Sequence, residues 1–385
     1  MNEPLLVAGT RPELIKMAPV IFALKRLKVC FKFLHSGQHY DYGLSQSFID
    51  QLELPQPDCE LAVKADNPAA LTGEVVTRTA GAIRSVRPSL VLVQGDTNTA
   101  LAATIAALKE KVPVGHVESG LRSYDWRMPE EHNRRMIDHV SDYLFAPTKT
   151  AYLNLQEEKT RGIKHITGNT VIDSTIHYVP KAEYVSRISE RLLFKEYVLV
   201  TAHRAENVDS AEILREFAET LQGSPLPVVF PVHPRTLKRF RDSGLLERLL
   251  SDRNIQLLPP VGYFDFLVLM KRSSLILTDS GGIQEEATSP SIRKRVVVMR
   301  DSTERPEAVK WGFARIAGTG KENIVRCITQ SLSCDKKLPA RSPFGDGSSG
   351  EQIARLVQEI TTLGHGPLPI PSQPDLIPAL LRSRA

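Results

Sequence analysis

The stretch LLVAGTRPELIKMAPVI, residues 5–21, decides the fold class of this chain. Its first four residues are apolar and predict a short buried strand. After Pro12, the residues Leu14, Met17 and Ile21 recur at the spacing of one helix face. The chain therefore opens as strand, turn and helix, the unit from which parallel sheets are built.

The same unit recurs along the chain. Further apolar runs predict strands at 89–93, 112–116, 142–146, 197–201, 228–232, 255–258, 275–278 and 295–299. The pattern is interrupted once, after Gly168, where a charged helical stretch to Leu193 is typical of a linker. Strands that alternate with helices indicate an α/β protein with parallel sheets covered on both faces. We therefore expect two Rossmann-like, doubly wound domains that face each other across a cleft.

The interruption also sets the expected domain limits. Residues 1–169 form the N-terminal domain with the candidate acid/base groups, and residues 170–365 form the C-terminal domain. This division allows the last helix, Glu351 to Leu363, to pack back on the N-terminal domain. Residues 366–385 begin Gly-Pro-Leu-Pro-Ile-Pro and are expected to be a Pro-rich tail.

Composition limits the class of partner. The 385 residues are 42% hydrophobic and 24% charged, as in ordinary globular proteins. The 49 basic and 44 acidic groups differ by only +5, which does not indicate nucleic acid but suits an anionic small molecule in a basic cleft. No run approaches the ~20 apolar residues of a membrane helix, and the N-terminus lacks a basic leader. These features predict a cytoplasmic protein without membrane insertion.

Metal-binding patterns are missing from the sequence. The cysteines are scattered without C-x-x-C spacing, which predicts reduced thiols. His132 and His139 stand seven apart on one predicted helix, but no third ligand falls into register with them. We therefore expect no metal.

Carboxylates gather at the ends of predicted elements. Asp96 and Glu118 each follow a strand, so they should share one wall of the cleft, and no partner for either is evident in the sequence. Glu130 begins a helix directly after Pro129. Glu131 stands four residues before Arg135, the spacing of a helical ion pair, so we expect it to be a helix-start charge. Asp96, Glu118 and Glu130 are thus the candidate acid/base groups.

A second group of residues suits phosphate. An apolar strand breaks at Ser280-Gly281-Gly282, where amides at a helix start could approach a diphosphate, and Glu286 one turn later could accept ribose hydroxyls. Arg305 could bind phosphate oxygens with two N–H groups, or form a surface ion pair. Arg11 and Lys16 flank another helix start and are either phosphate ligands or surface cations. His203 ends a strand and could serve a leaving phosphate or be a buried strand cap.

Ten motifs occur in one order along residues 5 to 365. They are GTRPELIKMAP, SGQHYDYG, QGDTNT, GHVESGLRS, PEEHNR, TGNTVID, TAHRAENVD, PVHPRT, TDSGGIQEEA and RDSTERPEAV. This series resembles the non-hydrolysing UDP-N-acetylglucosamine 2-epimerases. The resemblance implies a glycosyltransferase-B-like fold and interconversion of UDP-GlcNAc and UDP-ManNAc without a redox cofactor. It also implies a homodimer that supplies precursors for surface polysaccharide or glycans.

The resemblance assigns roles by motif position. Catalysis falls to Asp96, Glu118, Glu130 and His203, with His203, Arg11 and Lys16 near the UDP phosphates. UDP binding falls to Ser280, Gly281, Gly282, Glu286 and Arg305, and Phe266 lies near the uracil. The implied route eliminates UDP across C1–C2 to give 2-acetamidoglucal and then adds UDP back. Such a route needs a base, a proton source on the opposite face and support for departing UDP.

One segment departs from the family pattern. Residues 287–295, Ala-Thr-Ser-Pro-Ser-Ile-Arg-Lys-Arg, are longer than usual and lack a glycine, so the helix end and the fit around UDP are expected to differ. Two related activities remain open: a UDP-sugar glycosyltransferase and a hydrolysing epimerase that releases ManNAc and UDP. Three clustered acids argue against the transferase. The intact QGDT and STERPEA segments favour the non-hydrolysing branch over the hydrolysing one.

Overall fold

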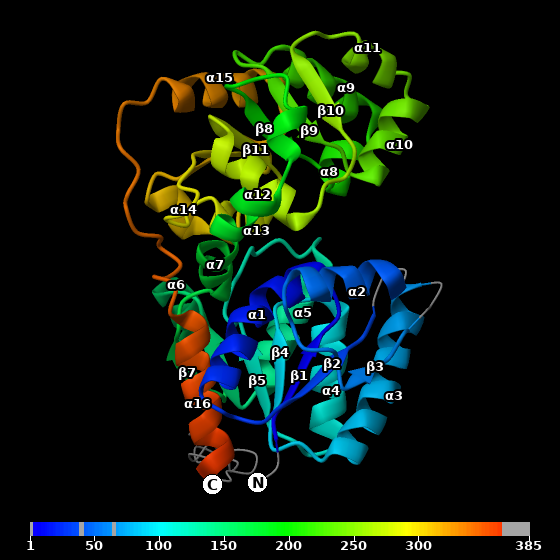
Figure 1. Cartoon of the computed structure of the whole chain (residues 1–385), viewed down its shortest axis with the longest axis vertical. Helices are drawn as coiled ribbons and strands as arrows, with labels where there is room; N and C mark the ends of the chain where they lie inside the picture. The colour runs from blue at the N-terminus through cyan, green and yellow to red at the C-terminus, as the bar shows by residue number, and fades with distance from the viewer. Residues whose placement is uncertain (1–2, 38–41, 64–66, 364–385) are drawn as a thin grey trace, which may run out of the picture.

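The computed structural model describes residues 3–37, 42–63 and 67–363. It has two lobes, each built around one parallel sheet (Figure 1). The predicted tail at 366–385 and the centre of the SGQHYDYG motif lie outside the described residues. Within the described residues, no helix is long and apolar enough to cross a membrane.

The first lobe holds a seven-stranded sheet in the order β3-β2-β1-β4-β5-β6-β7. All its pairings are parallel. Its strands are β1 (Leu5–Ala8), β2 (Lys32–His35), β3 (Cys59–Glu60), β4 (Val91–Gln94), β5 (Val114–Val117), β6 (Tyr143–Ala146) and β7 (Ile163–Ile166). The helices between them are α1 (Arg11–Arg26), α2 (Tyr42–Gln51), α3 (Pro68–Val86), α4 (Asn98–Lys109), α5 (Pro129–Val140) and α6 (Lys149–Glu157).

The second lobe holds a six-stranded parallel sheet in the order β10-β9-β8-β11-β12-β13. Its strands are β8 (Val198–Thr201), β9 (Val228–Pro231), β10 (Ile255–Leu258), β11 (Leu275–Thr278), β12 (Val296–Val298) and β13 (Ala314–Ile316). Its helices are α8 (Ala205–Val208), α9 (Ala211–Gln222), α10 (Pro234–Asp242), α11 (Leu246–Leu250), α12 (Tyr263–Arg272), α13 (Gly281–Glu286), α14 (Pro306–Lys310) and α15 (Lys321–Leu332). The predicted pair of Rossmann-like domains is confirmed.

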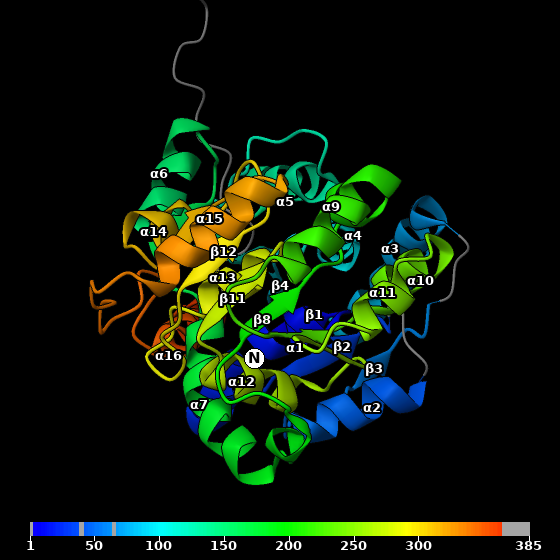
Figure 2. The same cartoon turned by 90° about the horizontal axis from the view of Figure 1, so that it is seen from above.

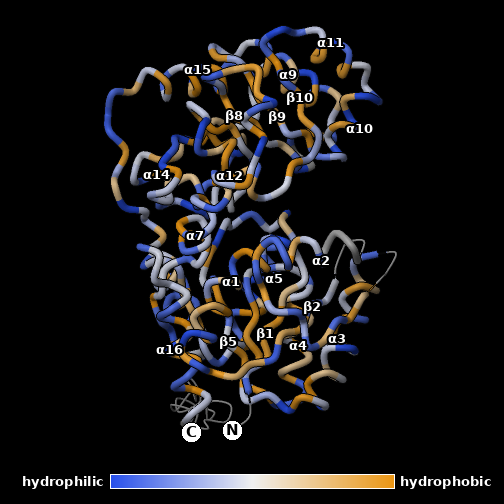
Figure 3. The backbone as a smooth tube through the Cα atoms, viewed as in Figure 1, coloured by the Kyte–Doolittle hydropathy of each residue, from blue (hydrophilic) through white to orange (hydrophobic). Residues whose placement is uncertain are grey.

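Apolar side chains alternate between the two faces of each sheet. In β1, Leu6 and Ala8 point into the core beneath α1, whereas Leu5 and Val7 join the core beneath α3 and α4. In Figure 3 the most hydrophobic parts of the tube are the central strands of both lobes. Strands buried on both faces are apolar along their whole length, which explains why apolar runs in the sequence predicted them.

Helix α7 (Thr170–Val185) connects the lobes, with a short 3₁₀ turn at Ile188–Arg191 after it. The charged helical stretch predicted as a linker is this helix, and it is packed into the core. Side chains such as Ile172, Tyr178 and Ala182 are fully buried in a core that continues from the first sheet to α12 of the second lobe. The charged residues of α7 contact other elements instead: Lys181 pairs with Glu53, Glu183 pairs with Lys271, and Asp173 meets the start of the last described helix. The helix is therefore amphipathic despite its charged composition.

The last described helix, α16 (Ser349–Leu363), returns to the first lobe and lies along α1 (Figure 1). Gly350 lets it approach, because a Cβ there would collide with the backbone of Pro19. The Gly350 N–H also donates to Asp173 Oδ1 at 2.8 Å. The first lobe therefore contains residues from both ends of the described chain, and the limits at 169 and 365 remain a prediction.

Each sheet reverses its strand order at one point. In the first lobe the reversal lies between β1 and β4, and in the second it lies between β8 and β11. Ligands of doubly wound sheets bind outside the carboxyl ends of the strands at such points. Seen from above, in Figure 2, β8 and β11 lie over β1 and β4. The two reversal points therefore face each other across the junction of the lobes.

Candidate active site

A cavity of about 410 Å³ lies where the two lobes meet. Its walls come from the starts of α1, α5 and α13, from the turns after β4 and β5, and from α12 and the start of α14. Most of the residues selected from the sequence line it: Lys16, Asp96, Glu118, Glu130, Phe266, Ser280, Gly281, Gly282, Glu286 and Arg305. The lining thus combines acids from the first lobe with a glycine turn and an arginine from the second.

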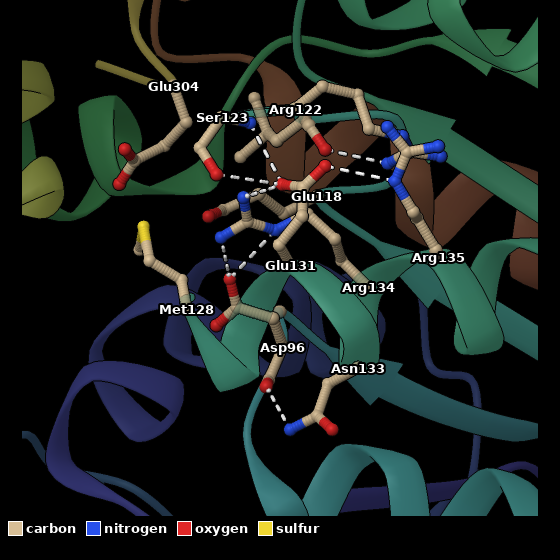
Figure 4. Close-up of polar contacts among 12 residues, drawn as sticks. Asp96, Glu118, Arg122, Ser123, Met128, Glu131, Asn133, Arg134, Arg135 and Glu304 are labelled. Carbon is tan, nitrogen blue, oxygen red and sulfur yellow. Dashed lines mark hydrogen bonds and ion pairs between the residues drawn. The ribbon is translucent and has the colours of Figure 1, made fainter. Parts of the chain in front are cut away.

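Asp96 follows β4 and is held by Arg134 of α5. Its Oδ2 accepts from Arg134 Nη2 at 2.6 Å and from Nε at 3.2 Å, and its backbone carbonyl accepts from Asn133 Nδ2 at 2.9 Å (Figure 4). The expectation that Asp96 lacks a partner is wrong. The partner lies 38 residues later, on an element that sequence spacing does not relate to β4.

Glu131 turns away from the cavity and is fully buried. Its carboxylate accepts from the backbone N–H and hydroxyl of Ser123, and it pairs with Arg134 at 2.8 Å and Arg135 at 3.0 Å. Burial raises the pKa of Glu131, but the Ser123 N–H and the two arginines outweigh it and the net shift is downward. The predicted pair with Arg135 is confirmed, although Glu131 is a buried anchor for the 123–134 segment rather than a surface charge.

Glu118 follows β5 and lies at the centre of a cluster of charges from both lobes. Its Oε2 is hydrogen-bonded by Lys16 and by Gln94 and Asn169, each of these two at 3.1 Å. Its Oε1 accepts from Arg305 Nη2 at 3.1 Å. Glu118, like Asp96, therefore has partners that the sequence did not reveal, and one of them belongs to the other lobe.

Glu285 completes this cluster from α13. It is fully buried, pairs with Arg305 at 2.5 Å and with Lys16 at 3.4 Å, and accepts from Asn169 at 2.9 Å. Burial raises the pKa of Glu285. Burial lowers the pKa of Lys16, but Glu118 and Glu285 outweigh it, so the net shift is upward. Lys16 is therefore a charged ammonium between two carboxylates.

The turn after β11 brings backbone amides to the cavity. Ser280 caps α13, and Gly281 and Gly282 are its first residues. A Cβ at position 281 would lie too close to the Glu304 carboxylate, which would have to shift. Burial raises the pKa of Glu304, but Arg305, Arg300, Arg134 and Arg204 outweigh it and hold the net pKa well below the usual range. An anionic group from the protein thus already occupies part of a strongly cationic site.

Arg305 lies at the cap of α14 and is 5% exposed. Of the two interpretations of this residue, the surface ion pair is wrong, because its acidic partners Glu118, Glu285 and Glu304 are all buried. Tyr263 and Phe266 of α12 form the neighbouring wall, where the Tyr263 hydroxyl lies 3.3 Å from Glu286 Oε1. This wall is mainly aromatic and apolar.

Arg11 and His203 do not line the cavity in the described residues, although their neighbours Pro12 and Arg204 do. The Arg11 guanidinium lies over the ring of Phe48 at 5.3 Å. The His203 side chain is 46% exposed and its Nδ1 lies 3.2 Å from Asp279 Oδ1. His203 is therefore not a buried strand cap, and both residues stand at the rim of the site.

The unusual segment 287–295 leads away from the cavity. Helix α13 ends at Glu286, and the Lys294 N–H closes the following loop on Ala287 O at 2.9 Å. Thr288 bonds Ser342, and Arg293 donates to Leu338 O. Among the described residues none from 287–295 lines the cavity. The segment thus packs against residues 338–342 and not beside the cavity, whose fit was expected to be affected.

Several lining or supporting residues were not selected from the sequence: Asn169, Arg134, Arg204, Glu285 and Glu304. Each stands inside a motif already quoted, and all except Asn169 lie within four residues of a selected residue. The motifs therefore contained the signal, but their side chains could be assigned only once the two lobes were placed together.

Comparison with known proteins agrees with this geometry. The sequence model of a family described as UDP-N-acetylglucosamine 2-epimerase matches residues 23–358. The chain belongs to this family. Among its curated members, the UDP-N-acetylglucosamine 2-epimerase of Methanocaldococcus jannaschii is 39% identical over 361 residues, covering 91% of this chain and 98% of the relative.

Other members of the UDP-N-acetylglucosamine 2-epimerase family extend the comparison. A crystal structure of the M. jannaschii enzyme in complex with UDP-GlcNAc and UDP has a TM-score of 0.85 and 38% identity, covering 93% of this chain and 99% of that one. The UDP-2,3-diacetamido-2,3-dideoxy-D-glucuronate 2-epimerase of Pseudomonas aeruginosa is 36% identical over 364 residues, covering 92% of this chain and 99% of the relative. The relatives of this chain thus include epimerases named for two different nucleotide sugars.

Glu286 provides a test of the site without a ligand. Burial raises its pKa to about 7. Because this pKa is above that of Glu286 in the unfolded chain, the folded protein binds the proton more tightly. The contribution of Glu286 to the free energy of unfolding is therefore fully present below the unfolded pKa and is lost as pH rises through about 7. Glu286→Gln should therefore raise the melting temperature of the ligand-free protein by a few degrees at pH 8 and have little effect at pH 5.

The matched control is Glu219→Gln. Glu219 is exposed, and its pKa is lowered by its hydrogen bond from Lys321. This variant should show no gain in melting temperature at pH 8. An equal gain from Glu286→Gln at both pH values would contradict the raised pKa.

Proposed function

We propose that this chain interconverts UDP-GlcNAc and UDP-ManNAc by the non-hydrolysing route. The observation that carries the proposal is the shared cavity. Asp96, Glu118 and Glu130 of the first lobe face Arg305 and the Ser280–Gly282 turn of the second across it. Family membership supports the substrate class, and the M. jannaschii structure contains both UDP-GlcNAc and UDP.

The reaction requires inversion at C2, a carbon that bears no activating carbonyl. Elimination of UDP across C1–C2 avoids this difficulty, because C2–H and C1–O break together to give 2-acetamidoglucal and UDP. The carboxylates provide groups to remove the C2 proton and to return one on the opposite face. Arg305, Lys16 and the α13 amides would support the departing diphosphate, with Arg11 and His203 at the rim. Glu286 would accept the ribose hydroxyls, and Phe266 would lie near the uracil.

The test is incubation of the purified protein with UDP-GlcNAc alone in heavy water, followed by proton NMR. We expect a mixture of UDP-GlcNAc and UDP-ManNAc that carries deuterium at C2. Product without deuterium would rule out elimination. Turnover only after an acceptor is added would indicate a glycosyltransferase, and free ManNAc with UDP would indicate a hydrolysing epimerase.

The Pseudomonas aeruginosa relative supplies the second candidate substrate. UDP-2,3-diacetamido-2,3-dideoxyglucuronate has a carboxylate and a second acetamido group that UDP-GlcNAc lacks. A parallel incubation with this sugar nucleotide separates the two. Its turnover in the absence of UDP-GlcNAc turnover would assign the chain to that substrate.

We also propose that the enzyme acts as a cytoplasmic homodimer without a metal or redox cofactor. The support is the family resemblance and the composition of the chain. Light scattering of the purified protein measures the mass of the assembly, and activity after treatment with a chelator tests the independence from metal.

A further inference from the structure

His116 of β5 is fully buried beneath the candidate active site, and both of its ring nitrogens face oxygen atoms. Nε2 lies 2.8 Å from the carbonyl oxygen of Gly95, and Nδ1 lies 2.7 Å from Oδ1 of Asp138. A carbonyl oxygen only accepts hydrogen bonds, and so does an ionised carboxylate. Each ring nitrogen must therefore donate, and only the doubly protonated imidazolium carries two N–H groups.

Asp138 has the surroundings of an ionised carboxylate. Besides His116, its Oδ2 accepts from the Gly120 N–H at 3.1 Å and pairs with Arg122 Nη1 at 2.8 Å. Burial raises the pKa of Asp138, but His116 and Arg122 outweigh it and the net shift is downward. Two donors on one oxygen leave the other oxygen to accept from His116.

From Asp138 onward, positively and negatively charged side chains alternate in a series of ion pairs around α5. Arg122 pairs with Glu158 at 2.6 Å, Glu158 with Arg135 at 2.6 Å and Arg135 with Glu131 at 3.0 Å. Arg134 pairs with both Glu131, at 2.8 Å, and Asp96, at 2.6 Å. Figure 4 shows the contacts from Arg135 through Glu131 and Arg134 to Asp96. The exposed His139 also approaches Glu158, at 3.5 Å. With His116 charged, the cations His116, Arg122, Arg134 and Arg135 match the anions Asp96, Glu131, Asp138 and Glu158 one for one.

The two ends of this chain of contacts meet at one turn. His116 bonds the carbonyl of Gly95, the residue directly before Asp96, whereas Arg134 holds the Asp96 side chain. Gly95 has a φ of +70°, which glycine adopts without strain. Glu118 also has a φ of +70°, which is unfavourable for a residue with a Cβ, and the following Gly120 has a φ of +83°. Asp138 anchors this second turn through the Gly120 N–H.

We propose that His116 is a positioning residue, held as an imidazolium by Asp138, that fixes the turns carrying Asp96 and Glu118. This rests on the proposed function, since it takes Asp96 and Glu118 as the reacting acids. His116 lies behind both turns and does not line the cavity. An ordinary core histidine would carry one proton and need only one acceptor.

The first test measures the charge directly. In protein labelled with ¹⁵N-histidine, the His116 ring should show a proton on both nitrogens at neutral pH, and Asp138→Asn should remove that pattern. A His116 ring with one protonated nitrogen in the wild type would overturn the proposal. This readout needs neither activity nor a His116 variant. If the wild type failed to epimerise UDP-GlcNAc, only the proposed function would fall.

The second test measures the consequence for catalysis. His116→Gln and Asp138→Asn should each lower kcat on the order of 10–100-fold, because a displaced acid loses alignment, while KM for UDP-GlcNAc stays unchanged. The double variant should be no slower than the slower single variant. A merely structural role would instead lower the melting temperature and leave kcat of the folded fraction intact, which would overturn the proposal.

His35→Gln is the matched control. His35 is also buried, at 3% exposure, and it also lies in a strand of the first sheet, but it forms no ion pair within the described part of the chain. Its kcat should equal that of the wild type. An equal loss of kcat in His35→Gln and His116→Gln would show that any buried histidine of this sheet has the same effect.

Discussion

Glu118→Gln, Asp96→Asn and Glu130→Gln should each lower kcat for epimerisation by at least ~10²-fold, the scale on which a proton-transfer group contributes. For Glu118 a second effect adds to the first. Both oxygens of the Glu118 carboxylate accept hydrogen bonds, from Lys16 and Arg305 among others. In Gln, an NH₂ group replaces one of these oxygens and would face a donor, so that hydrogen bond would be lost. Steady-state kinetics with UDP-GlcNAc measures kcat, and the melting temperature confirms that each variant is folded.

Glu110→Gln is the control for these three variants. Glu110 forms an exposed ion pair with Arg84 and does not line the cavity. It should retain wild-type kcat. Folded variants of all three acids with nearly full kcat would show that proton transfer relies on other groups in the cavity.

Arg305→Ala should weaken both the fold and the binding of UDP. Arg305 is buried between Glu118 and Glu285, and its removal leaves these buried carboxylates with fewer counter-charges. Breaking a buried pair in this way costs ~3–5 kcal/mol of unfolding free energy. Arg305→Lys keeps the charge but not the planar fork, so its effects should be intermediate. Urea denaturation and calorimetry with UDP measure the two quantities.

Arg315→Ala gives the comparison for Arg305. Arg315 lies on β13, is exposed and has Gln330 as its partner. Its unfolding free energy and its affinity for UDP should match the wild type. If Arg305→Ala changed the unfolding free energy no more than Arg315→Ala, the ion cluster would not stabilise the junction of the lobes.

The central strands could be predicted because they are buried on both faces. The runs at 255–258 and 275–278 coincide with β10 and β11. The strands β2, β3, β7 and β13 were missed. β2 begins with a charged lysine, β3 has only two residues, and β7 is exposed or half-buried along its whole length. Such strands owe their conformation to pairing with a neighbour, which local hydropathy does not report.

The candidate site was predictable by motif but not by contact. Lys16 and Gly281 could be placed at helix starts from their neighbours alone. The partners of Glu118 could not, because Arg305 lies 187 residues away and on the other lobe. His116 was equally hidden: in the sequence it is one more residue of a buried strand. Its importance depends on Asp138, whose side chain reaches it from another element.

The return of α16 to α1 has a consequence for synthesis on the ribosome. Helix α1 emerges before the second lobe, whereas its partner α16 emerges only after the whole of it. Until then the apolar face of α1 that α16 covers stays open to water and to other nascent chains. The first lobe therefore cannot finish folding while it is being translated, and its aggregation during expression should depend on how quickly residues 349–363 follow.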